Sequence, residues 1–237
     1  QCPSCPDPGE AAGCAGGAEG AKERAMSDWT LCIDFGTAFS KAAIVPTGAW
    51  SRFDPVRVRP LRLGAHDGRG NAFLLDSAVF IDADRVLFGR SAIARADALG
   101  GKRVALKSFK TLLSVSDLDR ALNTNAPLSV DPHRIFQMRD LIVLYLAYLL
   151  AAIEKARSLD TAIAGRIARR YAAPAWRGGD SAGLHGTVVR LFGEAEQLRA
   201  RIGEALLSDA GLDINAVTRE LPPAMERAQP LDMGLIY

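Results

Sequence analysis

The sequence predicts an α/β protein in which a mixed β-sheet is flanked by helices. Short apolar segments with strand propensity fill the region from 30 to 88, and longer segments with helical periodicity follow from 141. Strand-like segments then return at 169–175 and 233–237. Strands that precede helices and later alternate with them are typical of a mixed sheet covered by helices.

The composition agrees with a globular fold and argues against a nucleic-acid partner. Of the 237 residues, 49% are hydrophobic and 24% are charged, which is ordinary for a globular protein with a sizeable core. The 29 basic residues nearly balance the 27 acidic ones, for a net charge of +2. A protein dedicated to nucleic acid usually carries a basic stripe, so we expect no nucleic-acid partner.

Residues 1–25 differ in composition from the rest of the chain. They contain Cys2, Cys5, Cys14, three prolines and five glycines, with almost no large apolar residue. We expect a disordered leader, with Met26 as the natural start, because such a segment cannot bury enough surface to order itself. A structural zinc site needs four ligands, so no metal is expected here. No apolar signal-peptide core is present, which makes the cytoplasm the default compartment.

The strands are expected in the first third of the chain. Segments 30–35 and 40–45 flank a tight turn and predict a β-hairpin. Segment 56–63 alternates apolar and basic residues, which predicts a strand with one solvated face. Segments 77–81 and 85–88 predict two further strands, joined by a polar turn.

Two helices are expected in the middle of the chain. A short helix begins at Gly89 and runs to about residue 98. Segment 141–153 is apolar on every side of a helix. It is shorter than the roughly 20 residues that cross a bilayer, so we expect a helix buried in protein and no membrane partner.

The last third alternates strand and helix. A strand is expected at 169–175, followed by a long helix from residue 180 or 181 to about 208 and by a further helix from about 214. The long helix carries an apolar stripe at three- and four-residue steps, which predicts packing on a core. The stripe consists of Val188, Leu191, Ala195, Leu198, Ile202 and Ala205.

The best candidate site is the turn inside the first hairpin, Asp34-Phe35-Gly36-Thr37-Ala38-Phe39-Ser40. Gly36 allows the backbone to approach a ligand, and successive N–H groups of a turn favour an anion such as phosphate. A carboxylate beside a phosphate needs a cation between them, so Asp34 is placed to hold Mg²⁺ or its water shell. From these residues alone, an ordinary hairpin turn with a surface aspartate is an equally good interpretation.

Lys107 is the second candidate. It lies in an apolar stretch, where it can be a surface lysine with a buried stem or a positive charge near a phosphoryl group. The residues alone favour the surface lysine. His66, His133 and His185 lack the spacing of metal ligands and are expected on the surface or in turns.

Several segments, taken in order, resemble one protein family. Residues 31–40, Leu-Cys-Ile-Asp-Phe-Gly-Thr-Ala-Phe-Ser, resemble the first phosphate loop of the actin-like ATPase superfamily. The DnaK-type 70-kDa heat-shock chaperones, with Ile-Asp-Leu-Gly-Thr-Thr-Asn/Tyr-Ser, are the most similar. Residues 76–92 resemble their Pro-Ser-Val-Val-x-Phe and Val-Gly-x-x-Ala segments, 106–110 their Lys-Arg-Leu-(Ile/Leu)-Gly stretch, and 171–176 their Ile-Thr-Val-Pro-Ala-Tyr-Phe strand.

The resemblance implies a role for each matching residue. Asp34 matches the aspartate that organises Mg²⁺ through its waters, and Lys107 matches the lysine that positions the attacking water during ATP hydrolysis. Thr37 matches the threonine near the γ-phosphate, and Pro174 matches a proline that relays the nucleotide state to the substrate site. The backbone N–H groups expected to hold phosphate are those of Gly36, Thr37, Ala38 and Phe39.

The sequence departs from the family pattern at four quoted positions. Ala38 replaces the second threonine, Ser108 replaces the arginine after the lysine, Asp76 replaces a proline, and Trp176 replaces the tyrosine. These departures indicate a divergent member, and they weaken the expectation of chaperone activity more than that of nucleotide binding.

The resemblance implies a fold and a division of the chain. Residues 26–237 are expected to form the first lobe of an actin-like ATPase (ribonuclease H-like) domain, with a mixed five-stranded sheet and an inserted subdomain at about 102–165. The family's second phosphate loop and adenosine-binding segment come later than any residue here. We therefore expect no useful ATP hydrolysis by this chain alone.

The implied function is that of a DnaK-like chaperone, whose complete form hydrolyses Mg-ATP between two lobes and binds unfolded proteins and co-chaperones. Two alternatives stay open. One is a divergent actin-like ATPase that acts in cell shape, filaments or regulation. The other is a scaffold that keeps the fold without binding nucleotide.

Overall fold

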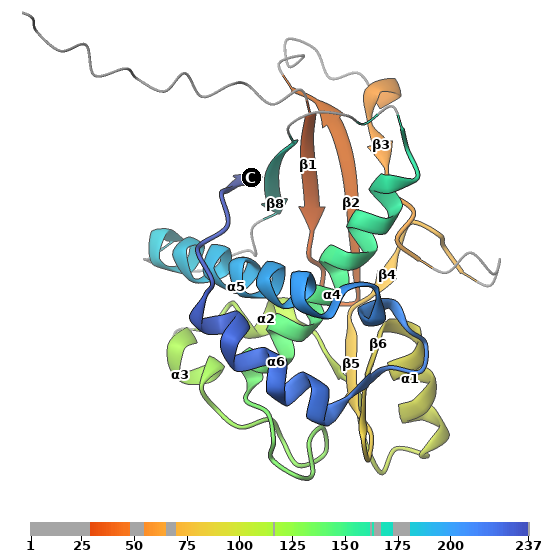
Figure 1. Ribbon diagram of the computed structural model, residues 1–237, viewed down its shortest axis with the longest axis vertical. Coiled ribbons are helices and arrows are strands. Elements are labelled where there is room, and N and C mark those ends of the chain that lie inside the picture. Colours follow the sequence, from red (N-terminus) through yellow and green to blue (C-terminus); the bar gives the residue numbers. More distant parts are fainter. Residues whose placement is uncertain are drawn as a thin grey trace, which may run out of the picture.

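The computed structural model describes residues 29–47, 55–64, 70–115, 117–161, 163, 167–172 and 181–236. The predicted leader 1–25 and Pro174 lie outside these residues. Figure 1 shows a large sheet at one end of the molecule, helices across its middle, and a smaller sheet at the other end.

The main sheet is mixed, as the sequence predicts. Its first two strands, β1 and β2, form the predicted antiparallel hairpin. Strand β8 pairs with β1 in parallel, and β10 pairs with β8 in parallel. Five strands follow one path in the order β10–β8–β1–β2–β3, and β4 pairs with β2 beside that path. The strands are β1 (Trp29–Asp34), β2 (Phe39–Pro46), β3 (Arg59–Pro60), β4 (Leu75–Asp76), β8 (Ile167–Ala172) and β10 (Met233–Ile236).

The register of this sheet places the carboxyl ends of β1 and β8 side by side. Ile33 of β1 lies opposite Tyr171 of the parallel strand β8, so both strands end at the same edge of the sheet. In the antiparallel hairpin, Asp34 lies opposite Lys41. The loop between β1 and β2 therefore begins where the parallel strands end, which is where α/β sheets usually bind ligands.

A second, antiparallel sheet forms the other end of the molecule. Its order is β7–β5–β6–β9, and α1 packs on β5 (Figure 1). The predicted strand pair and the helix after it are both confirmed. These elements are β5 (Ala78–Ile81), β6 (Arg85–Phe88), α1 (Gly89–Ala98), β7 (Leu106–Lys107) and β9 (Leu212–Asp213).

The segment 102–165 supplies only one strand of the second sheet, β7, and otherwise helices. The other three strands come from before and after it in the sequence. Its helices are α2 (Phe109–Leu112), α3 (Leu118–Leu122) and α4 (Met138–Ser158). The division of the chain into a lobe and an inserted subdomain stays a prediction.

The helical layer packs on the main sheet. Residues of α4 and α5 surround a small cavity together with Leu31 of β1 and Ile167 of β8, and α5 packs in turn on α6 (Figure 1). The centre of α4 is buried, as its apolar sequence predicts, and Gln137 and Asp140 form a capping box at its start. The remaining helices are η1 (Pro55–Arg57), α5 (Ser181–Ile202), η2 (Gly203–Leu207) and α6 (Ile214–Glu226). None of the helices among the described residues could span a membrane.

Two predicted elements differ from the structure. The strand expected at 56–63 shrinks to Arg59–Pro60, because proline offers no N–H to the next strand and favours a sheet edge. The helix expected to reach 208 ends at Ile202, because Gly203 has a φ of 68° and only a 3₁₀ turn follows.

Candidate functional site

The turn between β1 and β2 requires glycine at its second position. A Cβ on Gly36 would lie 1.9 Å from the carbonyl oxygen of Phe39, closer than any real contact. Phe35 before it is buried, whereas Thr37 and Ala38 are exposed. The turn is therefore tight, and its middle is open to a ligand.

Two hydrogen bonds hold this turn from the protein side. The carbonyl of Thr37 accepts from the backbone N–H of Ser108 at 3.1 Å, and the carbonyl of Ala38 accepts from that of Ser77 at 2.9 Å. Within the described residues, the N–H groups of Thr37 and Ala38 make no hydrogen bond of their own. These two donors are therefore available to an anion, and phosphate binding at the turn stays a prediction.

Three buried hydroxyl groups form hydrogen bonds next to the turn. The Tyr145 hydroxyl donates to Ser40 Oγ at 2.8 Å and lies 3.0 Å from Ser77 Oγ, and the two serine oxygens are 3.1 Å apart. Burial raises the pKa of Tyr145 to about 12, so its hydroxyl keeps its proton at neutral pH. This hydroxyl triangle joins the start of β2 to the segment before β5 and to α4.

Three stacked aromatic rings place α2 beside the turn. Phe35 lies 5.8 Å from Tyr145 and 6.3 Å from Phe109, and Phe109 lies 4.8 Å from Tyr145, measured between ring centroids. Phe109 and Tyr145 are fully buried. Because Phe109 is the first residue of α2, this stack fixes where the next residue, Lys110, stands.

Asp34 lies between two lysines. Lys110 Nζ is 3.4 Å from Oδ1 of Asp34, and Lys41 Nζ is 3.3 Å from Oδ2. The Asp34 side chain is 36% exposed, that of Lys110 only 20% and that of Lys41 60%. Each carboxylate oxygen thus has its own ammonium partner, and the three side chains together carry one positive charge.

The structure brings Lys110, not Lys107, to Asp34. Lys107 is exposed on β7, where it lies opposite Ala78, and it forms no ion pair within the part of the chain that the structure describes. A signal for Lys110 was present in the sequence, because Lys110-Thr111-Leu112-Leu113 agrees with the pattern Lys-Arg-Leu-(Ile/Leu) at every place except the second, where threonine replaces arginine. Lys41 had no such signal, since only the hairpin register reveals it.

The residues around Asp34 do not fit a directly held Mg²⁺. Magnesium takes oxygen ligands in an octahedron, usually one or two carboxylates with substrate phosphates and waters. The described residues contain no group of three or more side chains that could hold a metal ion. Both oxygens of Asp34 already contact ammonium groups. A metal at this carboxylate would have to displace a lysine.

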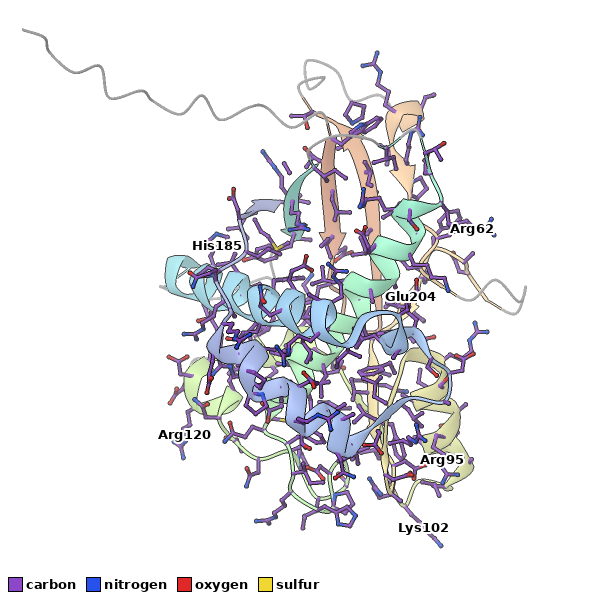
Figure 2. The ribbon with its side chains drawn as sticks, in the orientation of Figure 1. Arg62, Arg95, Lys102, Arg120, His185 and Glu204 are labelled. Carbon is purple, nitrogen blue, oxygen red and sulfur yellow. The ribbon has the colours of Figure 1, made fainter. Side chains whose placement is uncertain are left out.

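Two of the predicted histidines belong to the described residues. His185 stacks on Tyr171 at the carboxyl end of β8 and accepts or donates a 2.8 Å hydrogen bond with its hydroxyl, while His133 is exposed. Figure 2 shows His185 at one end of the helical layer. Pro174 lies outside the described residues, so its predicted relay role stays a prediction.

A large cavity among the described residues does not include the lysine-flanked turn. It holds about 850 Å³ between α1, α4 and β4, and none of the residues that line it is Asp34, Lys41 or Lys110. Its charged lining is mixed, with Arg62, Arg90 and Lys155 facing two carboxylates. None of the predicted site residues lines this cavity, so the lysine-flanked turn remains the better site.

Comparisons with known proteins do not extend the resemblance. None of the protein-family models matches this chain, and no curated protein matches it either.

Proposed function

We propose that this chain is the phosphate-binding lobe of an actin-like ATPase of the DnaK type. Its turn would hold the phosphates of ATP or ADP through the N–H groups of Thr37 and Ala38. The observation that supports this most is the joint placement of a glycine-dependent turn, Asp34 and Lys110 at the carboxyl edge of a mixed sheet. Ligands of α/β proteins favour that edge.

Lys110 takes the role that the resemblance assigns to Lys107. Phosphoryl transfer depends on fixed positive charge near the transferring group. Lys110 is largely buried, and the ring stack before it fixes its position, so its ammonium is held at the turn. The lysine that positions the attacking water in the complete enzyme is thus Lys110 in our proposal.

The proposed role of Mg²⁺ is restricted by the lysines at Asp34. The resemblance implies that Asp34 organises the metal through water, whereas both oxygens of Asp34 here contact lysines. When bound with ATP, the metal would supply charge neutralisation between phosphate oxygens. The turn and Lys110 bind and orient phosphate by themselves in this proposal.

Nucleotide titration of the chain with a changed turn tests the proposal. We expect ADP to bind the unchanged chain in isothermal titration calorimetry, and Gly36→Ala to lower the affinity about tenfold or more, because the added Cβ forces the turn open. Gly186→Ala is the matched control, since nothing lies within 4 Å of its added Cβ. It should leave binding unchanged.

Two outcomes would reject the proposal. Equal affinity of the Gly36→Ala variant and the unchanged chain would place the nucleotide elsewhere. Absence of binding at millimolar ADP, with Mg²⁺ or without it, would favour the nucleotide-free scaffold. The chaperone activity, with its unfolded-protein and co-chaperone partners, enters the proposal through the resemblance alone. A divergent ATPase of cell shape, filaments or regulation would bind ADP at the same turn.

A further inference from the structure

The second lysine at Asp34 changes how this site can neutralise a phosphate chain. Lys41 is the hairpin partner of Asp34, and its ammonium contacts the oxygen that Lys110 does not. A site that relies on a metal leaves its carboxylate open for the metal or its waters. Here two ammonium groups occupy the place where such a cation would stand.

The charge balance at the turn favours an anion. Two ammonium groups and one carboxylate leave a net charge of +1 beside the N–H groups of Thr37 and Ala38. A polyphosphate that approached Asp34 alone would be repelled, but each oxygen of Asp34 here contacts an ammonium group. Because Asp34 ends the strand that leads into the turn, we expect the turn donors and the lysines to act on the same phosphates.

Lys41 is free to reach a ligand. Its side chain is 60% exposed, and ion pairs of such exposed groups contribute little to stability. The ammonium can therefore leave Asp34 for a phosphate oxygen at low cost. Lys110 is more enclosed, at 20% exposure, and keeps Asp34 paired when Lys41 moves.

We infer that Lys41 is a second phosphate-binding cation of this site, and that with Lys110 it lets the chain bind polyphosphate without a divalent metal ion. The inference rests on the proposed function where the polyphosphate belongs to a nucleotide. It goes further by naming a residue outside the family pattern and by making the metal dispensable for binding.

Titration with inorganic tripolyphosphate tests the inference on the whole 237-residue chain. We expect binding in buffer that contains EDTA and no metal. Lys41→Gln should weaken this binding about tenfold or more, and Lys41→Arg, which keeps the charge, should weaken it by no more than about threefold. Lys102→Gln removes another exposed lysine, which lies at the end of the molecule away from the main sheet (Figure 2), and should change nothing.

The outcomes separate this inference from the proposed function. Tripolyphosphate that binds only with Mg²⁺, or that binds the Lys41→Gln variant as well as the unchanged chain, would overturn the inference, even if ADP still binds. Binding in EDTA that depends on Lys41, in a chain that binds no ADP, would support the inference and reject the nucleotide. Thermal unfolding of each variant excludes loss of fold as the cause.

Discussion

Two lysines three residues apart lie in different surroundings. Lys107 belongs to a strand and is exposed, whereas Lys110 belongs to the short helix α2, where the buried ring of Phe109 fixes it beside Asp34. The change from strand to helix between them decides which lysine reaches the turn. Ser108 makes that change with a φ of 62°, in the left-handed region that few residues other than glycine adopt.

We predict that Lys110→Ala weakens ADP and tripolyphosphate binding about tenfold or more, while Lys107→Ala weakens it less than about twofold. The reason is that, of these two lysines, Lys110 contacts Asp34 at 3.4 Å and Lys107 does not. Calorimetric titration of both variants measures the two affinities. If the Lys107 variant lost more affinity than the Lys110 variant, the assignment from the resemblance would be correct and ours wrong.

The sequence predicts the residues of the turn better than it predicts the lysines that contact Asp34. Asp34 and Gly36 belong to one short segment, whose pattern is local. Lys41 and Lys110 reach Asp34 through hairpin register and through a ring stack that joins distant segments. The family pattern could have pointed to Lys110, but neither contact with Asp34 follows from a single sequence.

The sequence correctly predicted the helices and strands that depend on neighbouring residues. The first hairpin, the strand pair before α1 and the helix α1 itself all appear within two residues of their predicted bounds. The two-residue strands β7 and β9 were not predicted, because they exist only by pairing with β5 and β6. Periodicity cannot reveal a strand of that length.

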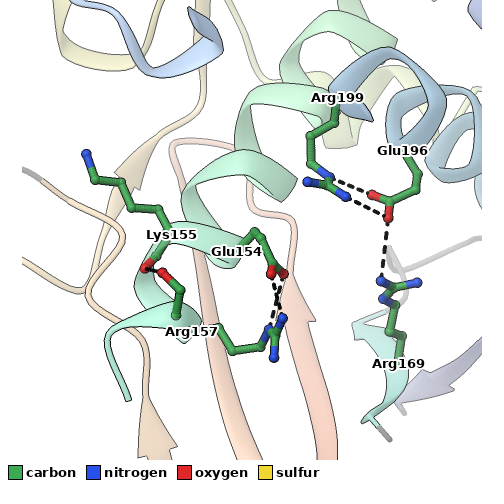
Figure 3. A network of polar contacts seen from close by, with 7 residues as sticks. Glu154, Lys155, Arg157, Arg169, Glu196 and Arg199 are labelled. Carbon is green, nitrogen blue, oxygen red and sulfur yellow. Dashed lines mark hydrogen bonds and ion pairs between the residues drawn. The ribbon is translucent and has the colours of Figure 1, made fainter. Parts of the chain in front are cut away.

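An ion-pair cluster is part of the contact between α5 and β8. Glu196 of α5 accepts two hydrogen bonds from Arg199 and lies 3.7 Å from Arg169 of β8 (Figure 3). Burial acts to raise the pKa of Glu196, but the two arginines outweigh it and the pKa is lowered from 4.5. A carboxyl group whose pKa falls on folding stabilises the native state at pH values above its unfolded pKa.

We predict that Glu196→Gln lowers the free energy of unfolding by about 1 kcal/mol at pH 7. This difference should shrink as the pH falls below 4.5, because the unfolded chain then takes up a proton at Glu196 that the folded chain, with its lowered pKa, still resists. The difference should disappear once the folded chain is protonated at Glu196 as well. Urea unfolding at several pH values measures it.

Glu154→Gln is the matched control for that experiment. Glu154 pairs with Arg157 on its own helix, and its side chain is 45% exposed (Figure 3). Its loss should cost less than about 0.5 kcal/mol. An equal cost for both substitutions would show that the contact with β8 contributes nothing.

For the whole molecule, a few buried groups connect the two sheets and the helical layer. The hydroxyl triangle joins Ser40, Ser77 and Tyr145, which belong respectively to the main sheet, to the chain just before the second sheet, and to α4. The hydroxyls of Ser40 and Tyr145 are 105 residues apart in sequence. No local pattern could predict this contact, although the apolar run of α4 did predict that the helix is buried.

The triangle lies directly beneath the candidate phosphate turn, so its loss should affect both stability and the turn. We predict that Tyr145→Phe, which keeps the ring stack and removes the hydroxyl, lowers the free energy of unfolding by about 1 kcal/mol. The cost stays small because Ser40 and Ser77 still lie 3.1 Å apart and can pair with each other. Urea unfolding measures this cost, and a double-mutant cycle with Ser77→Ala should show coupling of about 0.5 kcal/mol or more.

Hydrogen exchange tests the effect on the turn separately from stability. The Ser77 N–H donates to the carbonyl of Ala38, so its exchange rate reports how firmly the turn is held. We expect Tyr145→Phe to speed exchange at Ser77 more than at Val79, a buried residue of β5 whose strand pairs do not involve the turn. Equal acceleration at both amides would mean that the variant only lowers global stability, and that the triangle does not position the turn.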